Sequence, residues 1–143
     1  MNVPIKYLPK RLTKKDKAKQ KKQLKKSRAA YKKGIYINRK PLKSFKNKKS
    51  QHLLNAEKIY KINKVVINNN LAKKTGCSIK ALNKIVKKGI GAFYSSGSRP
   101  NQTSHSWGIA RLASSISGGK AAAIDYNILV ALAINNALHF WSI

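Results

Sequence analysis

The chain has 143 residues, of which 32 are Lys or Arg and only 3 are Asp or Glu, so its formal net charge is +29. Such an excess of positive charge points to a polyanionic partner, either nucleic acid or an anionic membrane surface. The acids are far apart in sequence, one cysteine is present and the three histidines are scattered, so carboxylate catalysis, a disulfide framework and a Cys- or His-based metal site are all disfavoured. We therefore expect a protein that is not an enzyme, takes no small-molecule substrate and holds no cofactor or metal.

The charge is unevenly distributed along the chain. Residues 1–50 carry a net charge of +19, residues 51–90 carry +8, and residues 91–143 carry only +2. Apolar residues are frequent enough to build a core only after residue 50. The sequence therefore predicts a partly disordered basic arm and linker over 1–50 and a helical domain over 51–143. The predicted fold class is mainly α, a small helical domain with a helix-turn-helix-like hairpin and a long basic N-terminal arm.

The arm is richest in lysine between residues 13 and 33. Thr13 and Asp16 have the spacing of a capping box with a short acid, and Gly34 can follow a helix end. Lysine repulsion and scarce apolar residues predict an arm that is disordered alone and orders against phosphates. The alternative is a solvated basic helix that Leu24 and Tyr31 pack onto the domain. The arm residues expected to bind nucleic acid are Lys14, Lys15, Lys21, Lys22, Lys25 and Lys26.

Two short stretches after the arm, 35–37 and 64–67, have brief apolar alternation that is compatible with short strands. The residues between about 41 and 50 read as a linker.

The stretch LAKKTGCSIKALNKIVKKG, residues 71–89, predicts two short helices. Asn70 is a candidate N-cap for the first helix, and Gly76 can end it in a positive-φ conformation. Ser78 then caps a second helix, Ile79–Lys88, which Gly89 closes. The apolar face of the second helix consists of Ile79, Leu82, Ile85 and Val86.

This arrangement resembles the helix-turn-helix family, with Ala72 where the helices approach, Gly76 in the turn and Cys77 after it. By that resemblance the second helix enters the major groove. Its expected contacts are Lys80, Asn83, Lys84, Lys87 and Lys88. The alternative is a plain helical hairpin with a solvated basic face. Cys77 is read as a small core residue, because no activating base is evident.

Residues 89–108 are rich in Gly and Pro and predict a loop. Within it, Phe93 and Tyr94 beside Arg99 either stack on bases or, as the preferred interpretation, close a small core. Arg99 is a further expected nucleic-acid contact. Thr103 or Ser104 can cap a helix that runs to about Ser117.

The C-terminal part begins with Ser117-Gly118-Gly119-Lys120 before an Ala-rich helix. This is either a phosphate contact with Lys120 as the counter-charge or a simple turn between helices. Polar residues interrupt the apolar stretch Ile124–Ile143, so it predicts a core or interface helix rather than a transmembrane one.

Three segments, LTKKDKAKQKKQLKKSRAAYKKG, LAKKTGCSIKALNKIVKKG and SSGSRPNQTSHSWGIARLASSISGGKAAAIDYNIL, together resemble an uncharacterised family of small basic proteins of nucleocytoplasmic large DNA viruses. The resemblance covers most of residues 7–129, and the tail VALAINNALHFWSI departs from the family's more polar ending. It implies a viral, virion-associated protein that is found in the host cytoplasm or nucleus during infection. It carries over no catalytic residue.

Charge and resemblance together predict a viral basic protein that binds DNA mainly through phosphates, in a packaging or virion-structural role. Two alternatives remain open. One is a minor capsid or scaffold protein that contacts capsid proteins or itself through the apolar C-terminal helix. The other is a ribosome-like RNA-binding protein.

Overall fold

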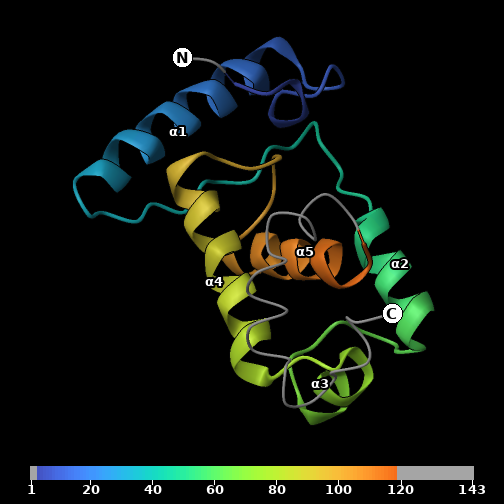
Figure 1. Cartoon of the computed structure of the whole chain (residues 1–143). Coiled ribbons are helices and arrows are strands. Elements are labelled where there is room, and N and C mark those ends of the chain that lie inside the picture. Colours follow the sequence, from blue (N-terminus) through green and yellow to red (C-terminus); the bar gives the residue numbers. More distant parts are fainter. Residues whose placement is uncertain (1–2, 119–143) are drawn as a thin grey trace. The chain divides into compact units, whose positions relative to one another are not determined.

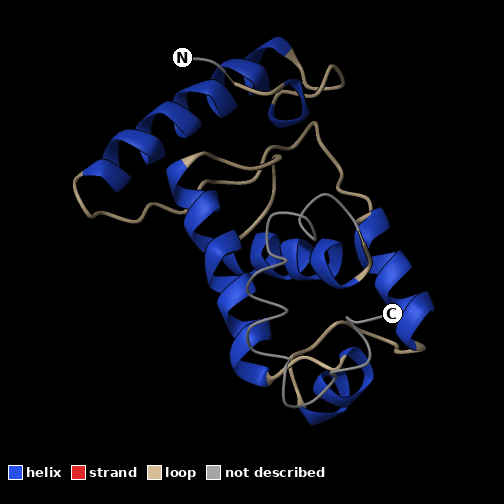
Figure 2. Cartoon of the chain, in the orientation of Figure 1, coloured by secondary structure: helices blue, strands red, loops and turns tan. Residues whose placement is uncertain are grey.

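The computed structural model describes residues 3–118 (Figures 1 and 2). The elements in chain order are the 3-10 turn η1 (Ile5–Tyr7) and the helices α1 (Lys14–Lys32), α2 (Gln51–Tyr60), α3 (Asn69–Thr75), α4 (Ile79–Ser95) and α5 (Ser104–Ile116). The mainly helical class is confirmed. Over 3–118 there is no strand, so the expectation of short strands at 35–37 and 64–67 is wrong. Both stretches lie in irregular connections between helices.

The chain divides into two compact units. Unit 1 contains the described residues of 1–48 and 90–107, and unit 2 contains those of 49–89 and 108–143. This division differs from the expected boundary at residue 50, because the N-terminal third packs with a segment more than forty residues further along the chain. Both α4 and α5 begin in one unit and end in the other.

In unit 1 the lysine-rich stretch forms a continuous helix, α1, rather than a disordered arm. Its inward face holds Gln20, Leu24 and Ser27, which are all buried. Their spacing of i, i+4 and i+7 places them on one side of the helix. Leu24 supplies the apolar contact, and the Gln20 side chain donates hydrogen bonds to the carbonyls of Tyr7 (3.3 Å) and Ser98 (3.4 Å). A narrow face with one aliphatic and two polar residues is therefore enough to dock this helix.

Both ends of α1 have the caps that the sequence predicts. The Thr13 hydroxyl accepts a hydrogen bond from the Asp16 N–H at 3.1 Å. The return half of the capping box passes through Ser44, which accepts from the Thr13 N–H and donates to the Asp16 carboxylate. At the other end Gly34 has φ +78°, and the Gly34 and Ile35 N–H groups close a Schellman motif on preceding carbonyls.

Two residues of the 96–103 loop, Asn101 and Gly97, make specific contacts with the N-terminal part of unit 1. The Asn101 side chain accepts from the Leu42 N–H at 2.6 Å and donates to the carbonyls of Leu42 and Phe45. It thereby fixes the 42–45 turn, where Leu42 and Phe45 form a buried cluster with Leu12. Gly97 has φ +126°, and a Cβ there would lie 2.8 Å from Leu24 Cδ2. Only glycine fits this position.

In unit 2, α3 and α4 are joined by the turn Gly76-Cys77-Ser78. Gly76 is left-handed at φ +72°, as expected, and Ser78 Oγ accepts from the Ala81 N–H. The N-cap of α3 is Asn68 rather than Asn70; its side chain accepts from the Leu71 N–H at 2.8 Å. Helix α3 starts at Asn69, two residues earlier than the apolar pattern indicates, so the residue before it, Asn68, is the N-cap.

The expectation that Gly89 ends the second helix, and that a loop follows over 89–108, is wrong for the first part of that range. Helix α4 continues through Gly89 and Gly91 to Ser95 (Figure 1). Gly89 is buried, and a Cβ there would lie 2.6 Å from Gly108 Cα on α5. Gly89 therefore permits a close approach of two helix backbones rather than a helix end.

Helix α5 starts where it was expected, with Thr103 as its cap. The Thr103 hydroxyl accepts from the Ser106 N–H at 3.0 Å, and the Ser106 hydroxyl accepts from the Thr103 N–H at 2.9 Å. This is a capping box in which serine replaces glutamate. The proposed phosphate turn at Lys120 and the apolar helix at 124–143 lie outside the described residues.

Candidate nucleic-acid interface

Positive charge covers the surface of the described residues. All of their Lys and Arg side chains are exposed except Lys17, Arg28, Arg39 and Arg111. Across 3–118, the one ion pair joins Lys49 to Glu57 at 2.7 Å. The other described acid, Asp16, is bound to Ser44. The described residues thus contain only two carboxylates, Asp16 and Glu57, against a large excess of exposed lysines.

Except for Lys17, the lysines of α1 are exposed and lie away from its docked face. Each residue of a helix is rotated by about 100° from the last, so seven or eleven residues are close to whole numbers of turns. The expected contact residues accordingly form two adjacent stripes. One consists of Lys14, Lys21 and Lys25, and the other of Lys15, Lys22 and Lys26; all six are exposed. Lys32 extends the first stripe and is exposed too, although the expected set omitted it.

The first half of α4 presents the second expected set. Lys80, Asn83, Lys84, Lys87 and Lys88 are all exposed. Beneath them Leu82 and Ile85 are fully buried and Val86 nearly so, as the apolar pattern predicts. Ile79 is the exception, since it is 38% exposed. It is the first residue of the helix.

Hydrogen bonds of the buried Thr75 hydroxyl stabilise the turn before α4. The Thr75 hydroxyl donates to the Leu71 carbonyl at 2.8 Å and accepts from the Cys77 N–H at 3.2 Å. Cys77 is 2% exposed, which confirms the core interpretation. Its burial also raises the pKa of the thiol. Lys74, which the sequence did not single out, donates to the carbonyls of Tyr60 and Lys61 and so caps the end of α2.

The aromatic residues near Arg99 divide between core and surface. Phe93 is fully buried, which confirms the core interpretation for that ring, whereas Tyr94 is half-buried and donates from its hydroxyl to Asn38 Oδ1 at 3.1 Å. Arg99 is exposed. Lys120, the remaining expected contact, lies outside the described residues.

Arg39 is a half-buried, hydrogen-bonded cation that the sequence did not single out. Its guanidinium donates to the hydroxyls of Ser27 and Ser98, each at 2.9 Å, and lies 3.9 Å from the centre of the Phe93 ring. Burial lowers its pKa to about 10, so it still carries its charge at neutral pH. The chain has only five arginines, at 11, 28, 39, 99 and 111, against 27 lysines. The rarity of arginine, whose planar guanidinium suits packed sites with several hydrogen bonds, is the signal that could have pointed to Arg39.

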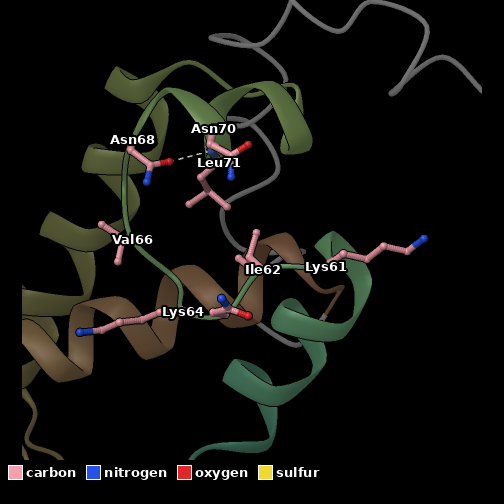
Figure 3. Close-up of a pocket in the computed structure, with 8 residues that line it drawn as sticks. Lys61, Ile62, Lys64, Val66, Asn68, Asn70 and Leu71 are labelled. Carbon is pink, nitrogen blue, oxygen red and sulfur yellow. Dashed lines mark hydrogen bonds between the residues drawn. The ribbon is translucent and has the colours of Figure 1, made fainter.

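A pocket of about 350 Å³ lies in unit 2 beside the connection from α2 to α3 (Figure 3). Its lining residues are Lys61, Ile62, Asn63, Lys64, Val66, Asn68, Asn70 and Leu71. The Lys61 and Lys64 side chains extend in opposite directions, away from Ile62 and Leu71. The lining thus offers aliphatic surface and amide groups, with no carboxylate, imidazole or thiol.

Other kinds of site find little support in the described part of the chain. Residues 3–118 hold no group of three or more His, Cys, Asp or Glu side chains placed to bind a metal ion. Among the same residues, no helix combines the length and the apolar character that crossing a membrane requires.

Comparison with known proteins places the chain in a family. No curated protein and no solved structure is significantly similar to the chain. A family model does match, over residues 4–128, which include all the described helices and both lysine surfaces. The chain belongs to that family, DUF5824, a family of unknown function.

Proposed function

We propose that the protein binds nucleic acid, with DNA as the expected partner, mainly through contacts between lysines and phosphates. The observation that carries this proposal is the outer face of α1, where two stripes of exposed lysine run along a helix whose opposite face is docked in unit 1. A disordered tail would have to be ordered on binding, whereas this surface is already in place.

The spacing of the lysines suits a regular polyanion. Residues 14 and 32 are about 27 Å apart along the axis at 1.5 Å per residue. That length corresponds to about eight base-pair steps of 3.4 Å. Lys21 and Lys25, like Lys22 and Lys26, are like charges at i and i+4, which destabilise an isolated helix. Phosphates along the stripes relieve this repulsion, so folding and binding favour the same state.

The first half of α4 is the second contact surface in this proposal. A three-residue turn, a left-handed Gly76 and a buried face under exposed Lys80, Lys84 and Lys87 agree with a helix-turn-helix reading. Asn83 is the one exposed side chain of this surface that can both donate to and accept from an adenine edge. Any sequence preference is therefore expected to depend on Asn83.

A salt titration of duplex DNA binding tests the proposal. Log affinity should fall with log salt by about 0.9 per phosphate contact. With six to ten contacts, affinity should fall about 10³- to 10⁵-fold between about 50 and 200 mM salt. Replacing Lys21 and Lys25 by Ala should reduce the slope by about two. Lys58→Ala with Lys64→Ala removes the same charge from exposed positions off α1 and serves as the matched control. A flat titration, or equal effects of the two double variants, contradicts the proposal.

The virion role rests on the sequence resemblance alone, and it has its own test. A genome-bound protein should leave particles with the nucleic acid, whereas a minor capsid protein should stay with the shell after nuclease treatment. Direct competition between RNA and DNA of equal length decides between a DNA-binding and a ribosome-like RNA-binding protein.

A further inference from the structure

Three tyrosines from separate segments of unit 1 meet in one exposed cluster. Tyr31 lies in the last turns of α1, Tyr36 in the connection that follows, and Tyr94 near the end of α4. The ring centres of Tyr31 and Tyr36 are 5.9 Å apart, and those of Tyr36 and Tyr94 are 5.1 Å apart. Tyr36 is nevertheless 66% exposed. A ring that is held by two neighbours still presents most of its surface to solvent.

The cluster has a rigid base. Tyr94 packs edge-on against Phe93, with ring centres 5.1 Å apart and planes at 88°, and Phe93 is fully buried. The Tyr94 hydroxyl is bound to Asn38, and the Arg39 guanidinium lies over Phe93. Because the supporting groups are already ordered, little side-chain entropy remains to be lost when a ligand stacks on Tyr36.

The surroundings of the cluster are apolar and cationic. Ile35, next to Tyr36, is 54% exposed. Lys32, Lys33 and Lys40 flank these residues in sequence and are exposed. The chain has no acid between Asp16 and Glu57. Flat aromatic surface beside lysines is the combination that binds single strands, since bases stack on the rings while the cations contact the backbone.

We propose that the Tyr31–Tyr36–Tyr94 cluster stacks on unpaired bases, so that the protein binds single-stranded nucleic acid. This inference rests on the proposed function and names a ligand class for it. Base faces inside a duplex are covered by their neighbours, so the lysine stripes of α1 suffice for duplex DNA, whereas the cluster acts only on an unpaired strand.

The test compares a thymidine oligonucleotide with an abasic oligonucleotide of the same length, because both carry the same phosphates and only one carries bases. The full chain should bind the thymidine strand about 5- to 150-fold more tightly, which corresponds to about 1–3 kcal/mol per stacked base. Tyr36→Leu keeps an apolar side chain and should remove most of this preference. Tyr36→Phe keeps the ring and should retain it, as should Ile35→Ala, the matched change at the neighbouring exposed residue.

Equal affinity of the wild-type chain for the two strands overturns the inference without any variant. A preference for the thymidine strand that survives Tyr36→Leu overturns the inference as well. If Tyr36→Leu also changes the sedimentation coefficient of the protein, the tyrosine cluster is a protein contact instead. Far-UV circular dichroism verifies the fold of each variant. Duplex binding and its salt slope, measured in parallel, separate the two proposals. Both should be the same in wild type and Tyr36→Leu, and loss of duplex binding or of its salt dependence in the wild type contradicts the proposed function rather than the stacking inference alone.

Discussion

At the scale of residues, the lysines and two of the arginines, Arg39 and Arg11, make different contacts in this chain. The lysines of residues 3–118 are almost all exposed, whereas Arg39 is packed between two serines and a phenylalanine, and Arg11 lies 5.1 Å from the centre of the Phe45 ring. The planar guanidinium can stack flat on a ring while its N–H groups donate in the plane, whereas an ammonium has no flat face to stack. The exposed lysines, with the exposed Arg99, are therefore the candidates for binding phosphate, whereas Arg39 stabilises the fold of unit 1.

Asp16 gives unit 1 a pH dependence of known sign. Hydrogen bonds from the Ser44 hydroxyl and then the Ser44 N–H lower the pKa of the Asp16 carboxyl below its usual 3.8. The carboxylate thus stabilises the fold fully above that value, and the contribution is lost as pH falls through the lowered pKa. Asp16→Asn should be less stable than wild type at about pH 6, with the difference narrowing toward about pH 2.

Urea unfolding of both proteins at the two pH values measures this difference. The background is small because the chain has only 3 acidic side chains in all. A stability difference that does not change with pH contradicts the role of the Ser44 hydrogen bonds.

At the scale of elements, the two glycines of α4 should respond in opposite ways to the same substitution. A Cβ at Gly89 meets the backbone of Gly108, whereas a Cβ at Gly91 has nothing within 4 Å. Gly89→Ala should destabilise the protein by about 1–3 kcal/mol through overpacking. Gly91→Ala should stabilise it by about 0.5–1 kcal/mol, because alanine loses less backbone entropy in a helix. Thermal or urea unfolding of the two variants measures both effects, and a neutral Gly89→Ala contradicts the close helix crossing.

At the scale of the whole molecule, residues 3–48 are part of a folded unit, so their removal should unfold more than themselves. Leu24 and Tyr7 pack on Gly97, and Gln20 donates to the Ser98 carbonyl. Deleting residues 1–48 should therefore strip hydrogen-exchange protection from 90–103, while the buried half of α4 before Gly89 keeps much of its protection. Unchanged exchange over 90–103 would show that the N-terminal third is a separate arm.

Much of the local structure could be predicted from sequence because it depends on local hydrogen bonds. The caps at Thr13, Ser78 and Thr103, the left-handed glycines at 34 and 76, and the exposed lysines of α1 and α4 all follow from spacing within a few residues. The mainly helical class follows in the same way, since helix periodicity is read within one segment. Net charge, which is a property of composition, identified the kind of partner that we propose.

Only the tertiary structure decided what depends on distant residues. Gly89 has the same sequence context whether it ends a helix or admits a crossing one, and the position of Gly108 settles the choice. The inward face of α1 carries one aliphatic residue and two polar ones, too few to predict burial, yet Ser98 and Gly97 supply its partners from far along the chain. Arg39 and the tyrosine cluster likewise acquire their roles only when segments that are tens of residues apart come together. Helix caps are local interactions, whereas close backbone approaches and buried polar contacts exist only between elements, so a single sequence indicates the first kind and leaves the second to the fold.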